Sequence, residues 1–576
     1  MTENLQLSHE QVDDVPLLLG LMERLGFPAI LDRHLGNHGN HQGISNGWLA
    51  TVWLSYILSQ SDHRKSSVQE WVDDLGHTLE TLTGQRLRPG IELSDDRLGI
   101  VLSRLSKESA RHGIDADLWS GSMTVYDLAL ESVRLDSTTT YGYHTPDEDG
   151  VMQHGHSKDH RPDLPQLKLM AAAAEPSGQI IACDVHAGNA ADDPLYVPLI
   201  ERVRQIVGRS GLLYVGDSKM AALSTRAQIV AHQDYYLTAL PLTGETAKQA
   251  DTWVAVIVDG EQGGKLIWEG DELLGAGYEF QRPLRVDSAY SGAIQWNERV
   301  LVVRSTDLAR QQAQGLEERL LHAEKELAGL TPAPGRGKRQ ISDEEALRTA
   351  IDQILQRRQV AGLLEITWQR EESNVTHVVG PGRSGPNRPT HSEVQVRYQI
   401  TTVQRNDAAI QARKHRLGWR FYVTNLPTTH MNLAQAAIHY RGGWSLERNF
   451  HLVKDLPLGL SPLFVRRDDQ IVGLTYLLTI ALRLLTLIET QVRRSLHQTN
   501  ETLTGLYEGN PNRATQQPTG KRLLKAFARA KIVLTHVEIS DQRLRHLTPL
   551  SPLLERILHS LGLSTKLYNQ LAVNSP

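Results

Sequence analysis

The chain has 576 residues, more than one ordinary hydrophobic core can organise, so two or more domains are expected. Hydrophobic residues make up 40% and charged residues 22%, a balance that is typical of a globular chain and excludes a disordered one. The single cysteine, Cys183, excludes an internal disulfide framework, and the net charge of −5 provides no overall attraction for nucleic acid. The polar, acidic start MTENLQLSHEQVDD is unlike a secretory signal peptide, and a cytoplasmic protein is expected.

Residues 1–120 are predicted to form a helical domain. Asp14 precedes an apolar stretch that has Pro16 near its start and Gly26 past its end, which is the usual punctuation of a helix. Ser45 can cap a further segment whose apolar residues recur every three to four positions. This pattern does not separate a recognition or dimerisation domain from a plain helical accessory domain.

Residues 121–242 are predicted to form the first part of an α/β core. In ESVRLDSTT, Val133 and Leu135 alternate with polar residues that include Asp136, as a strand requires. A turn at residues 175–178 separates the strands LKLMAAAA and QIIACDVH, and helices then alternate with the short strands LLYVGD and YYLTAL. Three strands followed by helix, strand, helix and strand predict an antiparallel meander continued by parallel strands. This is the ribonuclease-H-like order, a mixed sheet with flanking helices. A doubly wound α/β fold is the alternative, but it would need helices where this sequence has a turn.

Residues 243–417 are predicted to interrupt this core with a β-rich insertion. The segments WVAVIV, ERVLVVRS and EVQVRYQITTV alternate as strands do, with two helical stretches between them. GWRFYVTNLP resumes the core, whose second part spans residues 418–490. Residues 491–576 are predicted to be a helical, basic C-terminal region, in which KRLLKAFARAK carries five positive charges and no acid.

One apolar run, IVGLTYLLTIALRLLTLI at residues 471–488, has nearly the length of a membrane span. Arg483 lies inside it, and a charge at that depth in a bilayer is costly. A buried core helix is therefore favoured over a membrane span.

Two aspartates are candidates for a metal site. Asp136 lies on the first predicted strand, on the opposite face from Val133 and Leu135, and Asp217 ends the fourth strand, which lies beside the first in this layout. Two Mg²⁺ ions about 3.5–4 Å apart can catalyse phosphoryl transfer when carboxylates from different elements hold them. Asp184, near the end of the third strand, is the competing second acid. A helix cap is the alternative role for Asp217.

A third acid is predicted in YRGGWSLERNFHLVKD. The segment predicts a helix with an apolar stripe of Leu446, Phe450 and Val453. Glu447 and Lys454 lie on a neighbouring stripe, where the carboxylate can hold metal and the lysine can bind a phosphate. Asp455, at the helix end, is the alternative acid. A solvated face of Glu, His and Lys is the alternative interpretation of the stripe.

These segments together resemble a known family. LDSTT, YVGDSKMA and YRGGWSLERNFHLVK are similar to the aspartate, aspartate and glutamate regions of DDE transposases. They resemble in particular the bacterial insertion-sequence group that has a tyrosine–arginine–glutamate–lysine pattern around the third acid and a β-strand insertion in the core. Tyr440, Glu447 and Lys454 match that pattern. The family's usual arginine falls at Gly443, and Arg441 is the candidate to replace it.

The resemblance extends over most of the chain. Residues 12–64, the stretch HGHSKDHRPDLPQLKLMA and the stretch RATQQPTGKRLLKAF are similar to parts of one subgroup of these transposases, in the expected order. It implies an enzyme that binds terminal inverted repeats, hydrolyses DNA at the element's ends and joins the freed 3′-hydroxyl to target DNA. Another ribonuclease-H-like nuclease and a catalytically inactive, transposase-derived DNA-binding protein are the alternatives.

The resemblance also implies the site and its partners. Asp136, Asp217 and Glu447 would be the catalytic residues and the ligands of two divalent metal ions, Mg²⁺ or Mn²⁺. The partners implied are DNA, in the form of inverted repeats and target, and a second copy of the chain in a synaptic homodimer. Neither a nucleotide cofactor nor a membrane is expected, and a bacterial, nucleoid-associated location in the cytoplasm is implied.

A basic loop is predicted to help bind DNA. The residues predicted to contact it are Tyr440, Arg441, Lys454, Lys158, His160 and Arg161. In the loop, Lys158, His160 and Arg161 are suited to phosphate contacts. A zinc site built on His154, His156 and His160 is the alternative, but it lacks cysteines and a defined second half.

Overall fold

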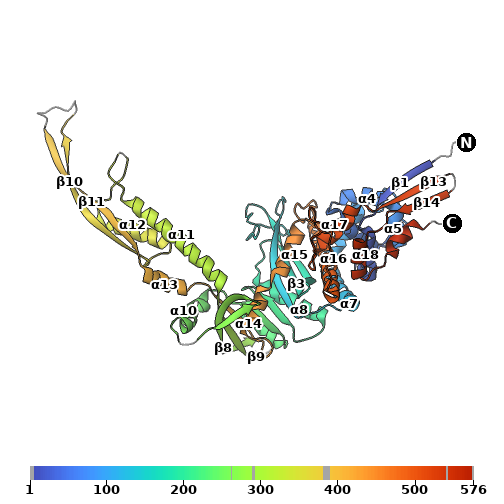
Figure 1. Cartoon of the computed structure of the whole chain (residues 1–576), viewed down its shortest axis with the longest axis horizontal. Coiled ribbons are helices and arrows are strands. Elements are labelled where there is room, and N and C mark those ends of the chain that lie inside the picture. The colour runs from blue at the N-terminus through green and yellow to red at the C-terminus, as the bar shows by residue number, and fades with distance from the viewer. Residues whose placement is uncertain are drawn as a thin grey trace.

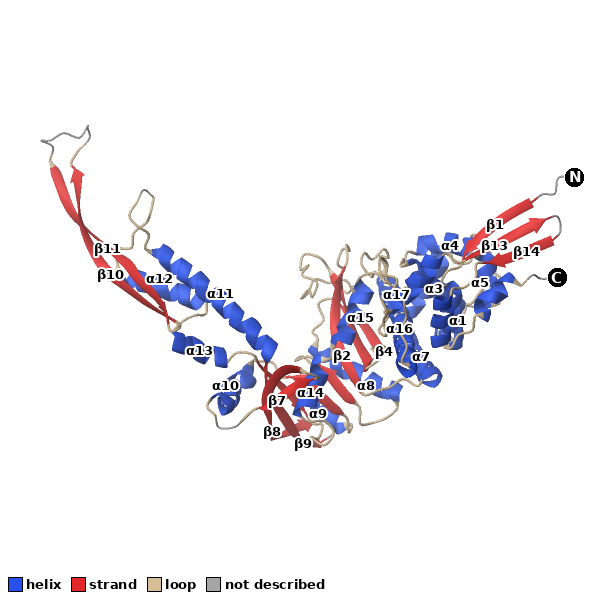
Figure 2. Ribbon diagram, in the orientation of Figure 1, coloured by secondary structure: helices blue, strands red, loops and turns tan. Residues whose placement is uncertain are grey.

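The computed structural model describes residues 5–39, 41–260, 263–288, 292–335, 337–380, 389–539 and 542–573. Figures 1 and 2 show an elongated molecule with a largely helical body that holds both ends of the chain, a central sheet, and an arm that projects away from the sheet. The large mixed sheet and the many helices confirm the predicted α/β class.

The helical body is assembled from both ends of the chain. Its N-terminal elements are β1 (Leu5–Gln11), α1 (Val15–Arg24), α2 (Phe27–Leu35), α3 (Asn46–Gln60), η1 (Lys65–Ser67), α4 (Val68–Asp74), α5 (Gly76–Thr83), α6 (Asp95–Leu105) and α7 (Glu108–Tyr126). Its C-terminal elements are α16 (Asp468–Thr499), α17 (Gly520–Ala530), β13 (Val533–Ile539), β14 (Gln542–Leu547), α18 (Pro552–Ser560), α19 (Lys566–Asn569) and η3 (Gln570–Ala572). The predicted cap of α3 is present, since the Ser45 side chain accepts a hydrogen bond from the Trp48 amide.

The ends of the chain are not purely helical, and in this the sequence-based expectation was wrong. β1 pairs antiparallel with β13, with Leu7 opposite Val537, and β13 pairs with β14. A single short strand is stable only with a partner, and β1 finds its partner more than 500 positions along the chain. Leu18 of α1 and Leu478 of α16 are buried in the same hydrophobic core, so the N-terminal and C-terminal regions pack as one body.

Helix α16 forms the centre of this body. It is long and apolar enough to cross a membrane, but 94% of its most apolar window is buried inside the protein. It packs on α6 and on the central sheet. Arg483, which is only 2% exposed, forms an ion pair with Asp115 of α7. These contacts confirm the predicted core helix.

The central sheet has nine strands in the order β4-β3-β2-β5-β6-β12-β9-β8-β7. These are β2 (Ser132–Tyr141), β3 (Gln166–Glu175), β4 (Gln179–Ala187), β5 (Leu213–Gly216), β6 (Tyr235–Ala239), β7 (Lys265–Glu269), β8 (Glu272–Ser288), β9 (Gly292–Ser305) and β12 (Trp419–Thr424). The pairs β2–β3 and β3–β4 are antiparallel, whereas β2–β5 and β5–β6 are parallel. The predicted meander with two parallel strands is therefore confirmed.

Helices cover both faces of the sheet. Helix α8 (Tyr196–Val207), which follows η2 (Asp193–Leu195), packs on the face that carries Val133 and Leu135, and α9 (Leu223–Ala231) connects β5 to β6. Helices α14 (Leu433–Arg441), α15 (Trp444–Lys454) and α16 cover the opposite face. Polar residues of β2 that point away from Val133 consequently face α15.

The region predicted as one β-rich insertion has two parts. The segment WVAVIV is not a strand but the end of helix α10 (Gly244–Val258), where Trp253 packs on Phe280 and Phe421. Strands β7 to β9 belong to the central sheet, because β9 pairs with β12. The projecting arm consists of α11 (Thr306–Leu330), α12 (Glu344–Arg357), β10 (Leu364–Val378), β11 (Thr390–Arg405) and α13 (Asp407–His415).

Candidate active site

Asp136 and Asp217 lie side by side at one place in the sheet. In the parallel pair β2–β5, Leu135 is directly opposite Gly216, so Asp136 and Asp217 are the next residues on the two neighbouring strands. Adjacent strands are about 4.8 Å apart. Helix α9 begins only at Leu223, so Asp217 is not its N-cap. The layout inferred from the strand pattern thus places the two carboxylates on adjacent strands.

Glu447 reaches the same region from helix α15. Leu446, Phe450 and Val453 are buried against the sheet, as the apolar stripe predicted. Glu447 follows Leu446 and is exposed, so its side chain lies next to the buried apolar stripe and is open to solvent. The helix begins at Trp444 directly after Gly442 and Gly443, and Glu447 lies in its first turn.

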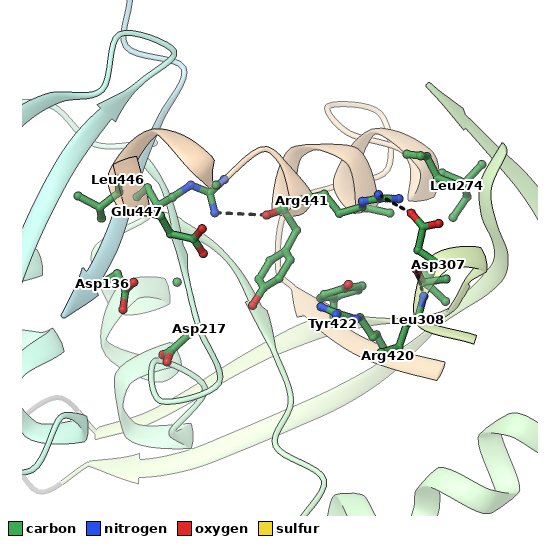
Figure 3. A pocket seen from close by; sticks show the side chains of 18 of the residues that line it. Asp136, Asp217, Leu274, Asp307, Leu308, Arg420, Tyr422, Arg441, Leu446 and Glu447 are labelled. Atoms are coloured by element: carbon green, nitrogen blue, oxygen red, sulfur yellow. Dashed lines mark hydrogen bonds and ion pairs between the residues drawn. The ribbon is translucent and has the colours of Figure 1, made fainter. Parts of the chain in front are cut away.

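A pocket of about 470 Å³ is lined by Asp136, Asp217 and Glu447 together. Figure 3 shows the three acids at one end of this pocket, with Arg441 and Asp307 at the other. Within the described ranges, no group of three or more His, Cys, Asp or Glu side chains is arranged closely enough to hold a metal ion. The three acids therefore share a pocket without forming a ready-made ligand cluster. The histidines of the loop likewise form no zinc site in the part of the chain that the structure describes.

The charge of Asp136 is balanced by a lysine. Burial raises the pKa of the Asp136 carboxyl, and the nearby Asp217 carboxylate raises it too, while the Lys158 ammonium lowers it. Lys158 Nζ lies 3.5 Å from Asp136 Oδ1, and the Ser137 amide donates to the same oxygen at 2.7 Å. A second negative charge beside a half-buried carboxylate favours a cation at this position.

Asp217 is oriented by its neighbours. The Tyr196 hydroxyl donates to Asp217 Oδ1 at 2.7 Å, and the Lys219 amide donates to the same oxygen at 2.9 Å. The competing acid of the sequence, Asp184, forms an ion pair with Arg202 of α8 instead. Asp184 is therefore part of a structural ion pair, and it does not line the pocket.

The basic loop between β2 and β3 contacts β2 and α15, two of the elements that carry the candidate acids. The Lys158 amide donates to Thr139 Oγ1 at 2.9 Å, and its ammonium donates to Ser137 Oγ at 3.0 Å. Lys454 Nζ of α15 lies 2.6 Å from Asp159 Oδ1. The loop thus ties the end of α15 to β2, and Lys158 and Lys454 each have a carboxylate partner.

The other predicted DNA contacts divide into two groups. Tyr440 and Arg441 line the pocket, and Arg441 Nη2 lies 3.5 Å from Asp307 Oδ2. His160 is exposed, with a positive φ of 56°. Arg161 pairs with Asp163 at 2.7 Å and does not line the pocket.

Arg134 is a site residue that the sequence did not single out. Its guanidinium is 2.6 Å from Glu175 Oε1 and donates to the His439 carbonyl at 2.8 Å. A Cβ built on Gly443 would lie 2.7 Å from Arg134 Nη1, so the guanidinium occupies the space next to Gly443. The arginine at this place therefore comes from β2, whereas Arg441 reaches toward α11. The only available signal was a charged residue on the same strand face as Asp136.

One comparison with known proteins identifies the family of the chain. The family model described as Transposase DDE domain matches residues 133–484, more than half of the chain, and this range includes Asp136, Asp217 and Glu447. The chain therefore belongs to the transposase DDE domain family. Enzymes of this family generally use divalent metal ions.

Other comparisons add little. No curated protein matches the chain significantly. A cryo-EM structure of a piggyBac transposase synaptic complex with hairpin DNA is similar at 8% identity, over 50% of this chain and 62% of that chain, with a TM-score of 0.22. The chain thus spans less than two thirds of that structure, and at this TM-score we draw nothing from the likeness.

Proposed function

We propose that this transposase cuts DNA at the ends of a bacterial insertion sequence and joins the freed 3′-hydroxyl to target DNA. The observation that carries the proposal is the shared pocket of Asp136, Asp217 and Glu447, which come from β2, the end of β5 and α15. Carboxylates that converge from separate elements are what metal-dependent phosphoryl transfer requires. The strand order β4-β3-β2-β5-β6 supports a ribonuclease-H-like core.

Asp136, Asp217 and Glu447 would hold two divalent cations, Mg²⁺ or Mn²⁺. The donor set fits this role, because all ligands are carboxylate oxygens and Asp217 uses Oδ1 for both of its hydrogen bonds, which leaves Oδ2 for a cation. When bound, such ions activate the attacking oxygen and stabilise the leaving oxygen. The acids line the pocket without a ready ligand cluster, so side-chain movement on binding is part of the proposal.

The remaining residues bind and orient. Tyr196 holds the Asp217 carboxylate through its hydroxyl, and Lys158, which pairs with Asp136, would bind a DNA phosphate at the same place. Lys454, about two turns beyond Glu447 on the same helix, exchanges Asp159 for a second phosphate. Tyr440 and Arg441 line the pocket toward α11, where the DNA strand would pass. His160 and Arg161 belong to the loop that carries Lys158 and would contact the backbone further out.

The proposal includes the setting of the reaction. The partners are DNA, as terminal inverted repeats and target, and a second copy of the chain in the synaptic complex. The expected location is the bacterial cytoplasm, at the nucleoid. No step needs a nucleotide cofactor, because both transfers use a phosphodiester that is already present in DNA.

The three acids provide the test. Asp136→Asn, Asp217→Asn and Glu447→Gln each remove one anionic ligand while keeping side-chain shape. We expect each to lower cleavage of the genomic DNA that borders the reading frame by at least about 100-fold, more than an outer hydrogen-bond partner of a metal site usually contributes. Binding of the same DNA should stay within a few fold. Gel assays of cleavage and joining, with and without Mg²⁺ or Mn²⁺, measure both.

Asp193→Asn is the matched control. Asp193 is exposed near α8 and lies 3.8 Å from Lys219, so its loss should leave cleavage unchanged. Retained cleavage in any of the three acid variants would remove that residue from the site. Cleavage by the wild type without joining would indicate another metal nuclease, and binding without cleavage would indicate a protein that only binds DNA.

A further inference from the structure

A basic surface lies on the C-terminal side of the helical body. Helix α17 buries Leu523, Leu524 and Phe527 in the core and exposes Lys521, Arg522 and Lys525 on its other face. Residues 509–531, which include the loop before the helix, contain six Lys or Arg and no acid. We call the surface formed by Arg513, Lys521, Arg522 and Lys525 the α17 basic surface.

Two of its arginines are held by one aromatic ring. Arg513 Cζ lies 4.2 Å and Arg522 Cζ lies 4.3 Å from the centroid of the Tyr507 ring. Neither guanidinium forms an ion pair among the residues that the structure describes. The ring thus positions two like charges near each other without neutralising them. An anion is the ligand that such a pair favours.

The other charged residues nearby do not cancel the excess of positive charge on the α17 basic surface. Lys525 pairs with Glu508 at 3.2 Å, but both side chains are more than half exposed, so water screens the pair. Arg529 donates to the carbonyls of Gly505 and Leu506 rather than to an acid. The whole chain has a net charge of −5, so the positive charge of this surface does not reflect the overall composition.

The surface adjoins the candidate active site. Lys521 Nζ donates to the carbonyl of Leu456 at 3.4 Å, two residues beyond Lys454 at the end of α15. Lys454 lies seven positions beyond Glu447 on the helix, a rise of about 10 Å. Helices α15 and α17 both pack on α16, and Figure 1 shows all three in the same part of the molecule. A duplex that reaches Glu447 can therefore continue over α17.

We infer that the α17 basic surface binds the phosphate backbone of duplex DNA that leads to the active site. The inference rests on the proposed function for the identity of the polyanion. Guanidinium groups bind phosphates through paired hydrogen bonds, which suits Arg513 and Arg522. The Tyr507 ring is already covered by two guanidiniums and is half-buried, so it offers no platform for an unstacked base. The contact is therefore to backbone and independent of sequence.

The salt dependence of binding tests this inference. The double variant Arg513→Gln with Arg522→Gln removes two phosphate contacts, and each contact contributes about 0.9 to the slope of log affinity against log salt. The slope for a random-sequence duplex of about 40 base pairs should fall by about 1.8. Between 50 and 200 mM KCl the wild type should therefore lose about 12-fold more affinity than the variant loses. Fluorescence anisotropy of the labelled duplex with the full chain measures both.

Two further variants separate charge from folding. Arg513→Lys with Arg522→Lys keeps both charges and should keep the wild-type slope. Arg348→Gln is the matched control, because Arg348 of α12 also lies over an aromatic ring, 5.3 Å from the centroid of Trp368, but on the projecting arm. Its slope should equal that of the wild type. A lysine variant that loses the slope as the glutamine variant does would overturn the inference.

The outcomes also separate this inference from the proposed catalysis. A wild-type slope in the double glutamine variant, together with loss of cleavage in the acid variants, would reject the surface and leave the function standing. A reduced slope in the double variant, together with retained cleavage in the acid variants, would support the surface and reject the catalytic site. A wild type that does not bind the duplex would overturn the inference.

Discussion

Arg134 and Gly443 form a steric pair at the junction of α14 and α15. The Arg134 guanidinium is buried and held by Glu175 and by the carbonyls of His439 and Tyr440. It fills the space beside Gly443, the N-cap residue of α15, four positions before Glu447. Gly443 has a φ of −67°, so a side chain is limited there by space and not by backbone conformation.

The first prediction at this scale concerns Gly443→Ala. The new Cβ would press on a guanidinium that is fixed by a buried ion pair, and such overpacking typically costs about 1–3 kcal/mol of the free energy of unfolding. Gly442→Ala is the matched control, since its nearest neighbour, the His439 carbonyl oxygen, would be 3.5 Å from the added Cβ. Urea denaturation should show a lower midpoint for Gly443→Ala and an unchanged one for Gly442→Ala. Equal midpoints would show that Arg134 can move without cost.

At the scale of elements, a buried ion network joins the helical body to the sheet. Asp115 of α7 is fully buried and pairs with Arg202 of α8 and with Arg483 of α16. The Tyr476 hydroxyl donates to Asp115 Oδ1 at 2.9 Å, and Arg202 also pairs with Asp184 of β4. One carboxylate thus connects three helices and, through Arg202, an edge strand of the sheet.

Removing this carboxylate should weaken the whole junction. Asp115→Asn leaves two buried guanidiniums short of a counter-charge, and breaking a buried pair in this way costs about 3–5 kcal/mol of the free energy of unfolding. The control is Asp117→Asn on the same helix, whose pairs with Arg33 and His34 are near the surface and contribute at most about 1 kcal/mol. Chemical denaturation that found the two variants equally stable would contradict a structural role for the network.

At the scale of the whole molecule, the two ends of the chain close the helical body. The Ile532 amide donates to Asp13 Oδ1 at 2.9 Å, and the Tyr568 hydroxyl donates to the Asp13 carbonyl at 2.7 Å. The next residue, Asp14, is 1% exposed, and burial raises its pKa to about 7. An acid that holds its proton more tightly in the folded state makes that state less stable as pH rises.

This predicts a pH-dependent stability that depends on Asp14. Its contribution is fully present below the unfolded pKa of 3.8 and is lost as pH rises through the folded pKa of about 7. At about 1.4 kcal/mol for each unit of difference, the loss amounts to about 4 kcal/mol. Asp14→Asn should therefore gain stability relative to the wild type between pH 5 and pH 8, as measured by urea midpoints. The exposed Asp74→Asn should keep the wild-type pH profile, and an identical profile for Asp14→Asn would contradict the assignment.

Local pattern was sufficient for the central strands and for the place of the acids along them. Val133 and Leu135 alternate with Asp136, and this alternation alone sets which face of β2 the aspartate occupies. The apolar stripe of α15 similarly places Glu447 beside the buried face of its helix. Their catalytic roles stay a proposal until the acid variants are measured.

Other features depend on contacts between distant segments. The segment WVAVIV alternates as a strand does, but in the structure it is helical. Its Trp253 packs on Phe280 and Phe421, which are distant in the sequence. The pairing of β1 with β13 and the approach of Arg134 to Gly443 each join residues more than 300 positions apart. The sequence by itself determined the periodicity of the elements and the spacing of the acids, because these depend on near neighbours along the chain. Only the tertiary structure decided that the Arg134 guanidinium lies beside the start of α15 and that β1 pairs with β13. Both contacts depend on space and charge contributed by remote segments.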